Sequence, residues 1–177
     1  MPRTSFLRNE FKILSVNAAL ATRDDKNPIY ANIPMHRRKP FKAVVRQVLA
    51  QIDADQGYIN GGVSEQVHCN FVEEVSNSVS RTATTFLHNG RFRIGIAQKL
   101  VNLYLKYLWC AGLISEPPHC PIDGIIRDRA GLTYNWIKSD NIDEYKLAIS
   151  EIRNLSNRDN LSIAEWELRN FSRRDEE

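Results

Sequence analysis

Apolar residues recur three and four positions apart along almost the whole chain, and no other feature of the sequence constrains its fold as much. This is the period of an α-helix that buries one face. The alternation typical of a strand occurs only over residues 91–94, which is too short a segment for a strand. The sequence therefore predicts an all-α fold, a compact helical bundle.

Caps and breakers set the expected helix boundaries. Ser64 and Ser162 suit N-caps, and Glu165 completes a capping box with Ser162. Pro40 suits a first helical turn, where its missing N–H costs nothing. The expected helices cover residues 6–21, 40–54, 64–87, 96–110, 124–131 and 141–155, with a last one from 162 onward.

Size and composition predict one helical domain over residues 1–177. A subregion of residues 1–60 would pack on a core of residues 64–177. The chain has 42% hydrophobic residues but no apolar run of about 18 residues, so we expect neither a membrane-spanning helix nor a membrane partner. The N-terminus lacks the apolar segment of a secretory signal. Three widely spaced cysteines do not resemble a disulfide framework, which predicts a reducing, cytoplasmic location.

The positive charge is unevenly distributed. The formal net charge is only +3, yet residues 36–46 and 91–106 both carry several cations and no acid. Such segments are compatible with a face that binds a polyanion. An ordinary solvated surface explains residues 36–46 equally well.

The segment from Arg91 to Asp123 holds the most specific pattern. We expect a tight link over residues 88–95 to join two helices into a helix-hairpin-helix, with an exposed turn at residues 95–97. Free amides at the start of a helix attract anions. The predicted phosphate-binding residues are Arg91, Arg93, Gly95, Ile96 and Ala97.

The residues Gly95-Ile96-Ala97-Gln98-Lys99, followed by Pro121-Ile122-Asp123, resemble the helix-hairpin-helix superfamily of DNA glycosylases. That family has Gly-hydrophobic-Gly-x-Lys and then Pro-hydrophobic-Asp, and Ala97 stands here where the second glycine is usual. The resemblance covers roughly residues 80–130. It implies excision of a damaged or modified base from DNA, with Lys99 as the amine nucleophile and Asp123 as the carboxylate that supports departure of the base.

The implied chemistry suits these residue types. A carboxylate stabilises the positive charge that develops on a sugar carbon, and a lysine becomes nucleophilic when burial or a neighbouring cation lowers its pKa. A flipped base would stack on aromatic rings. The candidates for this pocket are Tyr104, Trp109, Trp136 and Trp166.

No organic cofactor or metal is expected. The family's iron–sulfur branch needs four cysteine ligands, and the chain has three cysteines. The spacing of the cysteines and histidines matches no standard zinc site.

Two other functions remain open. In the first, the chain is a non-catalytic helical DNA-binding or protein-interaction module, such as a regulatory protein of a phage or mobile element. Lys99 would then contact phosphate and Asp123 would cap a helix. In the second, it is a purely protein-binding adaptor. The enzyme hypothesis requires Lys99 and Asp123 to face one site together with aromatic rings.

Overall fold

The computed structural model describes residues 2–21 and 24–172. Helices are the regular secondary structure of these residues, beside one isolated antiparallel bridge between Tyr30 and Leu87. The α-helices are α1 (Pro2–Leu20), α2 (Lys39–Ala54), α3 (Gln56–Asn60), α4 (Glu65–Thr82), α5 (Ile94–Cys110), α6 (Gly124–Ala130), α7 (Ile142–Arg158) and α8 (Ile163–Asn170). Three short 3₁₀ turns are η1 (Met35–Arg38), η2 (Thr84–Phe86) and η3 (His88–Gly90). The predicted all-α fold is confirmed.

Local signals placed several helix ends correctly. The Ser64 hydroxyl accepts a hydrogen bond from the amide of Val67 at the start of α4. Ser162 and Glu165 form the complete capping box that opens α8. Each cap satisfies amide groups that have no partner inside the helix.

Other boundaries differ from the expectation. The segment between the expected helices over residues 40–54 and 64–87 contains α3, which begins after Asp55 because the Asp55 carboxylate caps the amides of Gly57 and Tyr58. The helix expected to reach residue 87 ends at Thr82. The link between α4 and α5 is therefore longer than predicted, and it contains η2 and η3.

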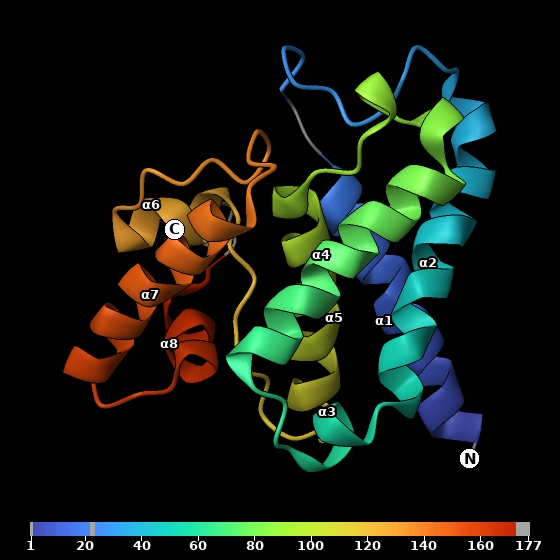
Figure 1. Ribbon diagram of the computed structural model, residues 1–177. Coiled ribbons are helices and arrows are strands. Elements are labelled where there is room, and N and C mark those ends of the chain that lie inside the picture. Colours follow the sequence, from blue (N-terminus) through green and yellow to red (C-terminus); the bar gives the residue numbers. More distant parts are fainter. Residues whose placement is uncertain (1, 22–23, 173–177) are drawn as a thin grey trace.

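The helices lie in two groups on either side of α5 (Figure 1). Helices α1, α2, α3 and α4 surround one side of α5, and α6, α7 and α8 form the second group. Helix α7 contacts both α4 and α5, which joins the groups. Most residues of α5 are buried, so this helix forms the centre of the core.

Within residues 2–21 and 24–172, no helix combines the length and the apolar character that crossing a membrane would demand.

Candidate functional site

Lys99 is a buried lysine on the inner face of α5. Its side chain is 9% exposed, and its ammonium nitrogen lies 4.1 Å from the centre of the Trp136 ring. Burial lowers the pKa of Lys99, while the negative charge of Asp123 raises it. Lys99, Asp123 and Trp136, three residues that the sequence singled out, therefore lie together.

Asp123 is the N-cap of α6. Its Oδ1 atom accepts hydrogen bonds from the amides of Ile125 at 2.9 Å and Ile126 at 3.1 Å. These bonds hold the carboxylate in a fixed orientation at the start of the helix.

Gln98 attaches the segment before Asp123 to α5. Its Nε2 donates to the Ile122 carbonyl at 2.7 Å, and its Oε1 accepts from the Ile122 amide at 3.2 Å. This paired contact fixes the backbone beside Asp123 next to the helix that carries Lys99. Sequence analysis missed Gln98, although a glutamine among apolar residues of a buried helix was a usable signal.

The exposed turn expected at residues 95–97 is wrong, because these residues are buried inside the first turns of α5. The Gly95 amide donates to the Ser139 carbonyl at 2.9 Å. A Cβ atom on Gly95 would lie 1.9 Å from the Trp136 carbonyl oxygen. The glycine therefore admits the backbone of residues 136–139 against α5.

The other predicted phosphate ligands also form hydrogen bonds within the chain. The amides of Ile96 and Ala97 both donate to the Arg93 carbonyl. The Arg91 Nε donates to both Asp140 oxygens, at 3.0 and 2.8 Å.

Arg93 also forms its hydrogen bonds within the chain. Its guanidinium donates to the carbonyl of Ile137 at 2.7 Å and to those of Asn27 and Pro28. Burial lowers its pKa. A phosphate at residues 91–97 would have to replace these contacts and those of Arg91, so this segment is not arranged to bind one.

Of the four aromatic candidates for a base pocket, Trp136 is the one beside Lys99. The Tyr104 hydroxyl donates to Asp53 at 2.5 Å, on the side of α5 that faces α1 and α2. The Trp166 Nε1 donates to Asp159 at 3.0 Å. Trp109 is half-buried near the C-terminal end of α5.

A chain of buried polar side chains, which sequence analysis missed, crosses the core beside this site. Gln98 Oε1 accepts from Asn102 Nδ2, which also donates to the Tyr145 hydroxyl at 2.9 Å. The Asn102 Oδ1 is then the acceptor for His68 Nε2 at 2.9 Å. The two bonds of Gln98 with the Ile122 backbone identify its oxygen and its nitrogen. They therefore also determine which atom of the Asn102 amide donates and which accepts.

The positions of the protons on His68 and His119, near the two ends of this row of polar side chains, follow from these directions. The Tyr58 hydroxyl donates to His68 Nδ1 at 2.8 Å, and the Tyr145 hydroxyl donates to His119 Nδ1 at 2.7 Å. His119 therefore carries its proton on Nε2, for which no acceptor lies among the described residues. Burial lowers the pKa of His68 to about 4. Burial, with the nearby His68 and Arg153, lowers that of His119 to about 2.

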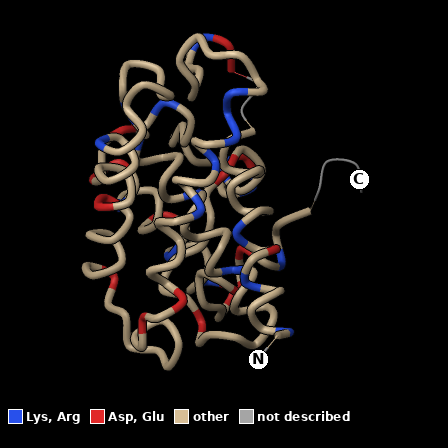
Figure 2. The backbone as a smooth tube through the Cα atoms, turned by 90° about the vertical axis from the view of Figure 1, so that its right-hand side faces the viewer, with Lys and Arg blue, Asp and Glu red and all other residues tan. Residues whose placement is uncertain are grey.

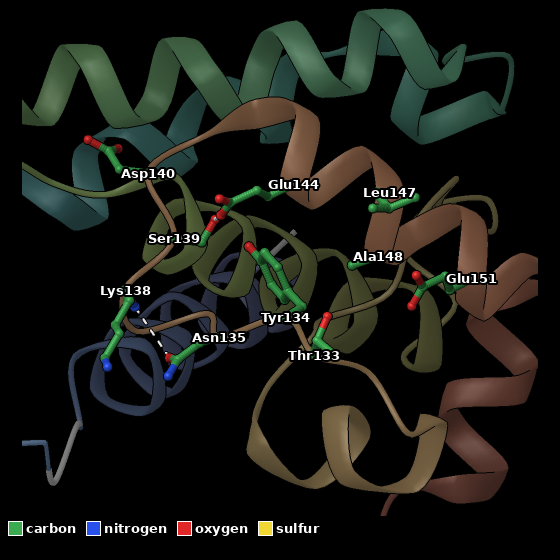
Figure 3. A pocket seen from close by; sticks show the side chains of 10 residues that line it. All are labelled: Thr133, Tyr134, Asn135, Lys138, Ser139, Asp140, Glu144, Leu147, Ala148 and Glu151. Atoms are coloured by element: carbon green, nitrogen blue, oxygen red, sulfur yellow. Dashed lines mark hydrogen bonds between the residues drawn. The ribbon is translucent and has the colours of Figure 1, made fainter.

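The structure also contains an open cavity of about 420 Å³ between residues 133–140 and α7 (Figure 3). The hydroxyls of Tyr134 and Ser139 point toward Glu144, and Ser139 donates to Glu144 at 2.6 Å. Lys99 and Asp123 do not line this cavity. In the part of the chain that the structure describes, no group of three or more His, Cys, Asp or Glu residues is arranged to hold a metal ion.

Comparison with family models, curated proteins and solved structures finds no match to this chain. The geometry of its own residues is therefore the basis for inferring a function.

Proposed function

We propose that this chain excises a base from DNA, with Lys99 and Asp123 as the reacting pair. The observation that carries the proposal is the buried Lys99 amine, which lies 4.1 Å from the centre of the Trp136 ring. Burial lowers its pKa, and the negative charge of Asp123 acts on it in the opposite direction. A lysine with a lowered pKa has a larger neutral fraction, and only the neutral amine is a nucleophile.

Each residue has a defined role in the reaction. The neutral Lys99 nitrogen attacks the sugar C1′ and forms a C–N bond, while the base leaves with the electron pair of the glycosidic bond. The nitrogen then loses one proton, and the departing base gains one. The Asp123 carboxylate stabilises the positive charge that develops on the sugar. Gln98 acts as a positioning residue, since it holds the backbone beside Asp123.

Incubation with duplexes that carry varied modified bases, followed by alkali to reveal abasic sites, tests the activity. Asp123→Asn should reduce excision at least about a hundredfold, the scale of one electrostatic group in a dry site. Lys99→Ala should abolish borohydride trapping of the protein on abasic DNA. Unchanged excision in the Asn variant would remove Asp123 from the mechanism.

The pairing has a readout that needs no activity. Asp123 raises the pKa of Lys99, so Asp123→Asn should lower it further, as followed by NMR titration of the lysine side chains. Asp128→Asn is the matched control, since it removes a carboxylate from α6, the helix that Asp123 caps. It should leave the pKa of Lys99 unchanged. If the pKa of Lys99 were the same in Asp123→Asn as in the wild type, the pairing of the two residues would be wrong.

The second candidate is a non-catalytic DNA-binding module, which the capping bonds of Asp123 favour because they account for this residue without chemistry. In that case no base is released from any duplex. Asp123→Ala would then cost only the loss of a cap, about 1 kcal/mol of unfolding free energy.

A further inference from the structure

A second cavity, of about 390 Å³, opens between the C-terminal end of α1 and the start of α2. Its polar lining consists of Asn17, Tyr30, Arg38, Lys39 and Lys42, and none of its lining residues is acidic. Three cations around one cavity repel one another, and an anion inside it would relieve that repulsion.

Two of these cations, Arg38 and Lys42, are held by contacts within the chain but retain hydrogen-bond donors. The Arg38 guanidinium lies 4.2 Å from the centre of the Tyr30 ring, and one of its nitrogens donates to the Ile33 carbonyl. Lys42 donates one hydrogen bond, to Asn17 at 2.8 Å. A guanidinium has five N–H donors and an ammonium has three, so donors remain for a ligand.

The positive charge extends beyond the cavity. No aspartate or glutamate occurs anywhere in residues 26–52. Within the described residues, no ion pair involves Arg37, Lys39 or Arg46, in contrast to Arg91 at the hairpin. Figure 2 shows the side of the molecule that α1 and α2 build, with Lys and Arg on several segments and Asp and Glu on others.

We propose that η1 and the first turns of α2 form the surface that binds the phosphodiester backbone of DNA. Arg38, Lys39 and Lys42 hold one phosphate in the cavity, and Arg37 and Arg46 contact its neighbours. Such contacts are electrostatic and do not distinguish sequences. The proposal rests on the proposed function only for the identity of the polyanion.

The test is the salt dependence of binding to an undamaged duplex, in which no base can be excised. The variant Arg37→Gln/Lys39→Gln/Lys42→Gln should lower affinity at least about tenfold near 0.1 M salt, and it should flatten the slope of log affinity against log salt by about 0.9 for each phosphate that is no longer neutralised. The matched control is Arg81→Gln/Lys146→Gln/Arg158→Gln, which removes the same charge from α4 and α7. It should keep the wild-type slope.

Three results would overturn the proposal. The first is an equal loss of affinity in both triple variants, which would mean that only net charge matters. The second is a wild-type protein with no measurable affinity for DNA at low salt. The third is tight binding of inorganic phosphate without any binding of duplex. Binding without excision of any base would refute the proposed enzyme while leaving this surface intact. Thermal melts of each variant verify that it is folded.

Discussion

Gly95 shows how one residue sets the geometry of the candidate site. The backbone of Trp136 lies against Gly95 so closely that no side chain fits between them. This contact brings the Trp136 ring over Lys99, which is one turn further along α5. The glycine that resembled part of a phosphate-binding turn therefore positions an aromatic ring.

Gly95→Ala should destabilise the protein by about 3 kcal/mol or more, because the new methyl group would overlap a backbone oxygen that cannot rotate away. Chemical denaturation monitored by circular dichroism measures this change. Gly112→Ala is the matched control: its Cβ would meet nothing within 4 Å, and its φ of +67° costs only about 1 kcal/mol. Equal losses in the two variants would contradict the close contact at Gly95.

Local residue patterns predicted part of this site and could not predict the rest. Asp123 is followed by a short helix, and its capping role depends on neighbours two and three residues away. The partner of Gly95 is Trp136, which approaches from a distant segment. Spacing along the chain carries no information on such an encounter, and the predicted exposed turn was wrong for that reason.

At the scale of elements, α5 carries two buried lysines toward the second group of helices. Lys99 lies near the start of α6, and Lys106 forms an ion pair with Glu167 of α8 at 2.8 Å. Glu167 is 1% exposed, and burial raises its pKa while Lys106 lowers it. The helical period of α5 predicted its apolar stripe, but the partners of its lysines follow from tertiary packing.

Glu167→Ala should lower the free energy of unfolding by about 3–5 kcal/mol, because it leaves the Lys106 ammonium buried without its counter-ion. The double variant Lys106→Met/Glu167→Leu removes both charges and should cost much less. Arg81→Ala is the exposed control, since it breaks the surface pair with Glu74 and should cost at most about 1 kcal/mol. A double variant that loses as much stability as Glu167→Ala would contradict the buried pairing.

At the scale of the whole molecule, the buried polar chain connects the two groups of helices. It runs from Tyr58 of α3 through α4 and α5 to Tyr145 of α7, and it ends at His119 before α6. Each member makes at least one of these hydrogen bonds, which offsets part of the cost of its burial, so the network favours one arrangement of these elements. The sequence predicted most of the helices that carry this network but not how they are arranged around it. Residues from five segments of the chain form the network, and they meet only in the folded core.

The two buried histidines of this network, His68 and His119, should make the stability of the protein depend on pH. In the fold the pKa of His68 is about 4 and that of His119 about 2, whereas an unfolded histidine has a pKa of about 6.5. Below pH 6.5 the unfolded chain therefore binds protons that the folded chain excludes, and the free energy of unfolding falls as pH falls. Each histidine should contribute a decrease of about 1.4 kcal/mol between pH 7.5 and 5.5, as measured by urea denaturation.

Single substitutions separate the contributions of the buried histidines to this pH dependence from those of other groups. His68→Gln should lower stability at pH 7.5 and remove about half of the pH dependence, because the glutamine cannot take up a proton. His36→Gln should leave the pH dependence intact, since His36 is exposed to solvent in the fold. The window above pH 5.5 avoids most carboxylate titration, which matters because the raised pKa of Glu167 acts in the opposite direction at lower pH. A flat stability profile between pH 7.5 and 5.5 in the wild type would mean that both histidines accept a proton in the fold, and the assigned hydrogen-bond directions would then be wrong.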